Sequence, residues 1–242
     1  MSARRADIAL VERGFFPSRA KAREAIEAGL VTIAGRIVTK PSEPIAEDAQ
    51  IAASAPYPWV SRGGVKLAAA LDAFDIDPAG KTALDIGAST GGFTHVLLSR
   101  NVAGVTCVDV GQGQLHASIA ADHRVKSLEK CDARALRSED LPEPPQLIVG
   151  DVSFISLMLI LPKILPLAAK RAEAILLVKP QFEVGPGRVK KGLVRDVKAR
   201  EQACEKIAGL VKELGWEIIG LMDSPIHGGD GNREFLLGAR RL

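Results

Sequence analysis

The sequence predicts an α/β protein with a parallel sheet, preceded by a small α+β domain. Beyond residue 59, short apolar runs that end in a charge alternate with helix-like segments, which is typical of a parallel sheet covered on both faces. Residues 1–40 show another pattern, with two short helices and a hairpin. Between the two regions, residues 41–60 contain four prolines, which indicates a linker without regular structure. We therefore predict two domains, 1–58 and 59–242.

Composition excludes several classes of protein. With 47% hydrophobic, 25% charged and 4% aromatic residues in 242, the chain is globular. Three cysteines are too few for a disulfide framework or a thiolate zinc site, and the four histidines have no ligand spacing, so we expect no metal. The most apolar stretch, residues 154–161, is far shorter than the ~20 residues of a membrane span. No signal peptide is evident, and we expect a cytoplasmic protein without stable membrane association.

The first domain begins with two predicted helices. Residues 7–14 form one helix that ends at a glycine, and residues 18–29 form a second, with Ser18 as its N-cap. A hairpin over residues 30–38 follows, and Ile51 lies in a possible further strand.

Positive charge is concentrated in this first domain. Residues 1–40 hold eight Lys or Arg against four Asp or Glu, while the whole chain has a net charge of only +3. Cations are unfavourable at a helix N-terminus, so Arg19, Lys21 and Arg23 indicate an anionic ligand, although a solvated helix face is the alternative. Residues 18–36 resemble the S4 RNA-binding domain. The candidate RNA-binding residues of this domain are Arg4, Arg5, Arg19, Lys21, Arg23 and Arg36.

The second domain has seven predicted strands. Five are expected to be parallel, and the last two to pair antiparallel because only a short loop joins them. The strands are predicted at residues 82–87, 104–110, 125–128, 147–151, 174–179, 216–222 and 234–239, with helices at 92–100 and 198–214.

A glycine loop and carboxylates follow the first strands. Residues 85–94 lack the spacing of a dinucleotide loop and the lysine of a phosphate loop. Asp109 could accept hydrogen bonds from both hydroxyls of a ribose, and Asp132 could accept one from an adenine amino group. Together with the glycine loop, these residues fit S-adenosylmethionine. The alternative is that they are ordinary turn residues. The candidate cofactor residues are Asp85, Gly87, Ala88, Ser89, Gly91, Gly92, Phe93, Thr94, Asp109, Val110, Asp132 and Asp151.

Four charged residues form the candidate catalytic centre. Asp151 and Lys179 end strands, Glu234 opens the last strand, and Lys66 precedes the sheet. Each alone could be a solvated charge, but together, in this order, they resemble the RrmJ/FtsJ class of 2′-O-ribose methyltransferases.

The whole chain resembles the TlyA (hemolysin A) family of rRNA methyltransferases, in the S4 segment, in residues 59–64 and in the segments around Asp151 and Lys179. The resemblance implies a Rossmann-like seven-stranded methyltransferase sheet that uses S-adenosylmethionine to methylate a cytidine 2′-hydroxyl in 23S rRNA and, in some members, in 16S rRNA. It makes ribosomal RNA or ribosomal subunits the expected partner. Trp59 stands alone where some members carry two tryptophans, and short termini are expected of members that act on 23S rRNA alone.

A ribose hydroxyl needs activation, and an ordinary lysine, with a pKa of about 10.4, is protonated. Repulsion by Lys66 and partial loss of solvent could lower the pKa of Lys179 enough for it to act as the base. In the other role, Lys179 stays charged and stabilises the developing alkoxide. Glu234 and Asp151 would orient the amines, without a metal.

A basic loop follows Lys179. Residues 185–200 carry six cations against one acid, which favours a clamp on the RNA backbone over a merely solvated loop. The candidate RNA-binding residues of this domain are Arg62, Arg188, Lys190, Lys191 and Arg195.

Two other functions compete with this interpretation. One is a ribosome-assembly factor without catalysis. The other is a membrane-active cytolysin, which would need an amphipathic or membrane-spanning segment, and none is evident.

Overall fold

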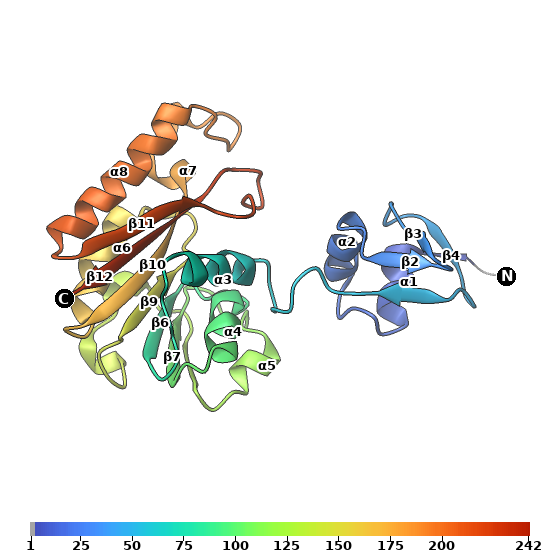
Figure 1. Ribbon diagram of the computed structural model, residues 1–242, viewed down its shortest axis with the longest axis horizontal. Helices are drawn as coiled ribbons and strands as arrows, with labels where there is room; N and C mark the ends of the chain where they lie inside the picture. Colours follow the sequence, from blue (N-terminus) through green and yellow to red (C-terminus); the bar gives the residue numbers. More distant parts are fainter. Residues whose placement is uncertain (1–2) are drawn as a thin grey trace. The chain divides into compact units, whose positions relative to one another are not determined.

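The computed structural model describes residues 3–242, and the chain divides into two compact units after Pro58 (Figure 1). We call them the N-terminal unit and the C-terminal unit. Each has a hydrophobic core of its own.

The N-terminal unit packs two helices against two small sheets. Its core contains Leu10, Ile26 and Val31, all of them buried. The Ser18 hydroxyl accepts a hydrogen bond from the Lys21 amide at 3.4 Å, which confirms the predicted N-cap. The elements are α1 (Ala6–Glu12), α2 (Arg19–Glu27), β1 (Ala3–Arg5), β2 (Val31–Ile33), β3 (Arg36–Ile37), β4 (Pro44–Ala46) and β5 (Ile51–Ala53). Strands β3, β2 and β5 form one antiparallel sheet, and β1 pairs with β4.

The proline-rich segment corrects one prediction. Residues 41–60 were expected to lack regular structure, yet β4 and β5 lie within them. Pro44 is the first residue of β4 and lies opposite Arg5 in a two-stranded sheet, where a missing N–H is tolerated. Proline therefore limits the length of this strand without preventing it.

The C-terminal unit is built on a seven-stranded sheet with the order β11-β12-β10-β9-β6-β7-β8. Strand β12 runs antiparallel to both of its neighbours, and the other neighbouring pairs are parallel, as predicted. The strands are β6 (Thr82–Ile86), β7 (Gly104–Val108), β8 (Val125–Leu128), β9 (Leu147–Gly150), β10 (Ala172–Val178), β11 (Glu217–Asp223) and β12 (Phe235–Arg241).

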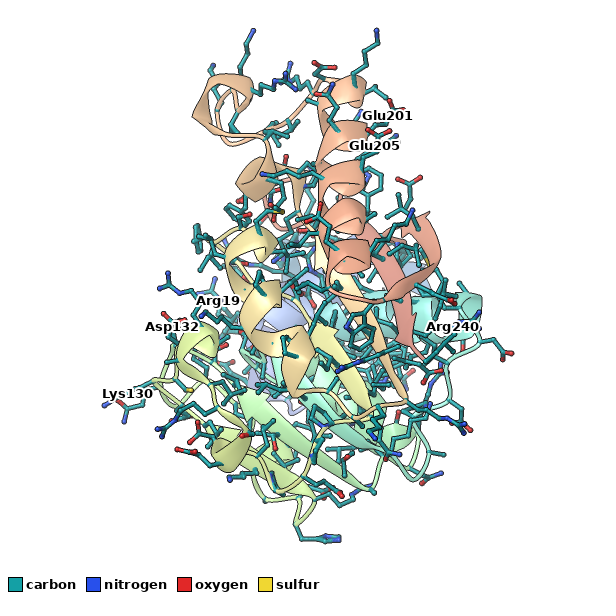
Figure 2. All side chains as sticks on the ribbon, turned by 90° about the vertical axis from the view of Figure 1, so that its left-hand side faces the viewer. Arg19, Lys130, Asp132, Glu201, Glu205 and Arg240 are labelled. Atoms are coloured by element: carbon teal, nitrogen blue, oxygen red, sulfur yellow. The ribbon has the colours of Figure 1, made fainter. Side chains whose placement is uncertain are left out.

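Helices cover both faces of this sheet (Figure 1). On one face lie α3 (Gly63–Ala73) and α4 (Gly92–Ser99), and on the other α6 (Leu157–Ile164) and α8 (Val197–Glu213). Glu201 and Glu205 of α8 point away from the sheet (Figure 2), while Ile207 and Val211 are buried against it. Two further helices of one turn each are α5 (Ala117–Ala120) and α7 (Pro180–Glu183).

Over residues 3–242, no helix has the length and hydropathy needed to cross a membrane. The same residues contain no group of three or more His, Cys, Asp or Glu side chains placed to hold a metal ion.

Candidate active site

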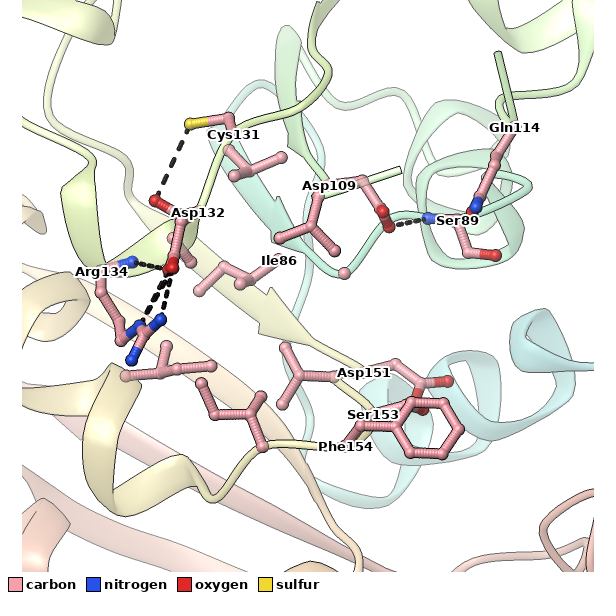
Figure 3. A pocket seen from close by; sticks show the side chains of 17 residues that line it. Ile86, Ser89, Asp109, Gln114, Cys131, Asp132, Arg134, Asp151, Ser153 and Phe154 are labelled. Carbon is pink, nitrogen blue, oxygen red and sulfur yellow. Dashed lines mark hydrogen bonds and ion pairs between the residues drawn. The ribbon is translucent and has the colours of Figure 1, made fainter. Parts of the chain in front are cut away.

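A cavity of about 570 Å³ opens at the carboxyl ends of the central strands (Figure 3). This is the edge at which parallel α/β sheets bind ligands. Six predicted cofactor residues line it: Gly87, Ser89, Asp109, Val110, Asp132 and Asp151. The other lining residues are Ile86, Val108, Gln114, Cys131, Ala133, Arg134, Val152, Ser153, Phe154, Ile155 and Ile160.

Asp109, directly after β7, is held by two backbone amides. Its Oδ2 accepts from the Ser89 amide at 2.8 Å (Figure 3). Its Oδ1 accepts from the Gly111 amide at 2.7 Å. Each carboxylate oxygen can accept more than one hydrogen bond, so Asp109 keeps capacity for a pair of hydroxyl donors. The neighbouring Val110 is 73% exposed and offers an apolar surface at the same wall.

Asp132, after β8, has a partner that the sequence did not indicate. Arg134 donates to both of its oxygens, the closest contact being 2.6 Å from Nη2 to Oδ2 (Figure 3). These hydrogen bonds hold the pKa of Asp132 below its usual range. The carboxylate therefore stays an ionised acceptor at the cavity wall.

Gly87 brings the glycine loop against β9. Its φ of 76° lies in the left-handed region, and a Cβ on it would lie 2.6 Å from the Asp151 carbonyl oxygen. Only glycine allows the two strand ends to approach this closely. The carboxyl ends of β6 and β9 therefore form one wall of the cavity.

Half of the predicted cofactor residues do not line this cavity. They are Asp85, Ala88, Gly91, Gly92, Phe93 and Thr94. Asp85 lies inside β6 rather than at its end, fully buried, and accepts from Thr94 Oγ1 at 2.6 Å. Burial raises the pKa of Asp85 to about 7, against the effect of the Thr94 hydrogen bond. We therefore correct the expected place of Asp85: it supports the glycine loop from within the sheet.

The four predicted catalytic residues form one cluster, which we call the Lys-Asp-Lys-Glu cluster: Lys66, Asp151, Lys179 and Glu234. Lys66 Nζ donates to Glu234 Oε2 at 2.6 Å and lies 3.9 Å from Asp151 Oδ2. Lys179 Nζ lies 2.6 Å from Asp151 Oδ1. Asp151 thus lies between the two ammonium groups.

This cluster is buried and electrically balanced. Lys66, Lys179 and Glu234 are 7%, 8% and 4% exposed, and two cations face two anions. It meets the cavity through Asp151 and through Ser153, whose hydroxyl accepts from Lys179 Nζ at 2.7 Å. The cluster can therefore act on a group that enters beside the cavity, with Lys179 as the nearest amine to Ser153.

The predicted RNA-binding cations of the N-terminal unit have acidic partners. Arg4 pairs with Glu12 at 3.4 Å, and Arg36 with Glu43 at 2.5 Å. Lys21 contacts Tyr57 and lies 3.5 Å from Glu24. Arg5, Arg19 and Arg23 all bind Asp7. The charge excess of this unit is thus organised by ion pairs.

The basic loop is attached to the segment before β12 by a residue that the sequence analysis missed. Asn232 is 3% exposed; its Oδ1 accepts from the Val194 amide at 3.1 Å and its Nδ2 donates to the Gly192 carbonyl at 2.8 Å. The exposed cations Lys190, Lys191 and Arg195 flank these anchor points. Arg188 donates to Gln202 of α8, and Arg62 is exposed at the start of α3.

Ser153 was also missed as a site residue. The signal was its position two residues after Asp151 at the end of a buried strand, where side chains meet the ligand edge. Asn232 carried no such signal, because its partners lie about forty residues away in the chain.

Comparisons with known proteins found matches to both units of the chain. The model of FtsJ-like methyltransferases matches residues 59–241, and that of the S4 domain matches residues 4–51. A 16S/23S rRNA (cytidine-2′-O)-methyltransferase TlyA of Mycobacterium tuberculosis is 44% identical over 239 residues, which cover 98% of this chain and 89% of the relative. A 23S rRNA (cytidine-2′-O)-methyltransferase TlyA of Campylobacter jejuni is 42% identical, over 73% of this chain and 69% of the relative.

Among solved structures, this chain is similar to one from Streptococcus thermophilus that is provisionally named a hemolysin. The TM-score is 0.78 and the sequence identity is 37%. The match covers 100% of this chain and 89% of that one.

Proposed function

This chain belongs to the TlyA family of FtsJ-like rRNA methyltransferases, and from that premise we propose that it methylates the 2′-hydroxyl of a cytidine ribose in ribosomal RNA. The observation that carries the proposal is the buried Lys-Asp-Lys-Glu cluster, which adjoins the cavity through Asp151 and Ser153. A bare nucleoside-binding site would have no use for two buried lysines held by two carboxylates.

S-adenosylmethionine fits the cavity as the methyl donor. The volume of about 570 Å³ lies within the usual range of small-molecule sites, ~300–1,000 Å³. Asp109 would hold the ribose hydroxyls, Asp132 the adenine edge, and Val110 with Ile155 the ring faces. When bound there, this cofactor would supply an activated methyl group beside Asp151.

Lys179 is the proposed group at the ribose hydroxyl. As a base, its Nζ would take the hydroxyl proton; as an ammonium, it would stabilise the developing alkoxide oxygen. Lys179 Nζ lies 2.6 Å from Asp151 Oδ1 and donates to Ser153 Oγ at 2.7 Å, so the amine is held in place at the cavity for either role. Glu234 holds Lys66 in turn, so that the second cation keeps its distance from Lys179 and orients Asp151.

RNA binding is proposed for two sets of cations, those of the N-terminal unit and those of the basic loop with Arg62. Phosphate contacts position an RNA without reading its sequence. Buried Asn232 would hold the basic loop in place for this contact. We propose 23S rRNA as the main substrate and 16S rRNA as a second.

The test is incubation of the purified protein with methyl-labelled S-adenosylmethionine and separate 30S subunits, 50S subunits and deproteinised rRNAs. We expect label in a cytidine 2′-O-methyl group after nuclease digestion of rRNA from 50S subunits, with Asp109→Ala as a cofactor-site control. Binding to subunits without label in any substrate would instead support an assembly factor without catalysis.

A further inference from the structure

Asp7 is a buried acid at the centre of the cationic surface of the N-terminal unit. It lies in the first turn of α1, is 0% exposed, and receives three guanidinium groups. Arg5 donates to both carboxylate oxygens, at 3.1 and 3.3 Å. Arg19 donates twice to Oδ2, at 3.3 and 2.9 Å, and Arg23 once, at 3.0 Å. We call these four residues the Asp7 cluster.

The local structure dictates this convergence. Arg19 and Arg23 are four residues apart on α2, so they lie on the same helix face. Arg5 immediately precedes α1 and donates to Oδ1, whereas Arg19 and Arg23 donate to Oδ2. The hydrogen bond of Arg5, followed by those of Arg19 and Arg23, holds the pKa of Asp7 well below its usual range despite its burial. The acid is therefore ionised at neutral pH.

The arginines of the Asp7 cluster keep binding capacity on their outer side. Their side chains are 45%, 51% and 47% exposed. A guanidinium has five N–H donors, and within residues 3–242 these three make hydrogen bonds to Asp7 alone. Three cations against one anion leave two positive charges, whereas the pairs Arg4–Glu12 and Arg36–Glu43 are neutral.

From these observations we infer that Asp7 is a positioning residue for RNA: it removes one positive charge from the surface but fixes three guanidinium forks in one array that binds phosphate. This inference rests on the proposed function, because it assumes an RNA substrate. Long arginine side chains lose rotamer entropy when they bind, and an array that is already ordered avoids that loss. Asp7 therefore raises RNA affinity although its own charge repels RNA.

Two substitutions with the same effect on net charge separate organisation from charge. Asp7→Asn and Glu12→Gln each add one positive charge to the N-terminal unit, but Glu12 is exposed and pairs with Arg4. We expect Asp7→Asn to weaken binding of deproteinised 23S rRNA by roughly tenfold, the effect of about one charge-assisted contact. We expect Glu12→Gln to leave that binding equal or tighter. Across a salt titration, the slope for Asp7→Asn should fall by about one.

A second variant keeps the test decisive if Asp7→Asn unfolds the N-terminal unit. Arg19→Lys preserves the charge of a half-exposed side chain but loses the fork that binds Asp7 twice. It should weaken RNA binding several-fold in a protein that retains full affinity for S-adenosylmethionine and an unchanged melting temperature.

Two outcomes would overturn the inference: a folded Asp7→Asn protein that binds 23S rRNA as tightly as wild type, or wild-type affinity in Arg19→Lys. A wild-type protein that binds neither rRNA nor subunits would instead overturn the proposed function, so the two failures are distinguishable.

Discussion

The Asp7 cluster and the Lys-Asp-Lys-Glu cluster are built on the same motif and arranged in opposite ways. Each has an aspartate that receives more than one cation. In the N-terminal unit the acid is buried and the arginines are about half exposed; in the C-terminal unit the two lysines are buried and Asp151 is the more exposed partner, at 21%.

This difference in solvent exposure suits one cluster to binding a polyanion and the other to holding reactive groups in place. An excess of exposed cations attracts a polyanion and releases its counterions, whereas balanced buried charges keep fixed positions at low solvent exposure. Arginine, always charged and rigidly forked, suits the first arrangement, and lysine, which can exchange a proton, suits the second. The residue types and the solvent exposure therefore fit the proposed roles, RNA binding for the Asp7 cluster and catalysis for the Lys-Asp-Lys-Glu cluster.

The largest effect should come from the C-terminal cluster. Lys179→Ala should lower the methylation rate by roughly 10²–10⁴-fold, the usual contribution of a positioned acid or base, with little change in affinity for RNA. Single-turnover assays with saturating rRNA measure this step. Lys179→Arg distinguishes the two roles: substantial activity would favour charge stabilisation, while an inactive variant would favour proton removal. Wild-type rates in Lys179→Ala would contradict the proposed catalytic centre.

Removing an acid should destabilise the two units to different degrees. Glu234→Gln leaves Lys66 buried with Asp151 3.9 Å away as its nearest acid, so we expect a loss of about 3–5 kcal/mol in the free energy of unfolding. The matched change Glu12→Gln removes an exposed partner and should alter that free energy by about 0–1 kcal/mol. Denaturant titrations give both values; equal losses would show that burial of the acid does not set the size of the loss.

Asp85 provides a third case, a buried carboxylate that accepts from the Thr94 hydroxyl and pairs with no cation among residues 3–242. Its folded pKa of about 7 lies above the unfolded value, so its contribution to stability is complete at acidic pH and is lost as the pH rises to about 7. Asp7 has the opposite sign, and its contribution is lost as the pH falls. Asp85→Asn should therefore gain stability relative to wild type between pH 5 and pH 8, on the order of 3 kcal/mol. Melting curves at both pH values test this, and a constant difference would refute it.

The smallest effect concerns the cavity, which adjoins the Lys-Asp-Lys-Glu cluster at Asp151. Asp109→Ala removes the proposed acceptor for the ribose hydroxyls and should weaken S-adenosylmethionine binding by about tenfold. Calorimetric titration measures the affinity, with Glu129→Gln, an exposed acid nearby, as the control. Unchanged affinity would remove Asp109 from the cofactor site.

Sequence patterns predicted the sheet well because its strands are continuous apolar runs with charged ends. They missed α3, since Gly63 and Gly64 disfavour a helix start and packing against α4 overrides that preference. They also missed β1 and β4, because three-residue strands form only through each other. The strand-end rule brought Asp151 and Lys179 together correctly. It could not show that Arg5, Arg19 and Arg23 share Asp7, because that choice of partner depends on tertiary contacts.

The close approach at Gly87 has a consequence for how this protein can evolve. Because any Cβ there would strike the backbone of Asp151, a substitution at position 87 would disturb the glycine loop and the catalytic strand end in one step. Neither change could be compensated on its own side of the contact. A saturation library scored for rRNA methylation should therefore recover glycine alone at this position. It should accept many residues at Gly209 of α8, where φ is not positive and a Cβ would meet nothing within 4 Å.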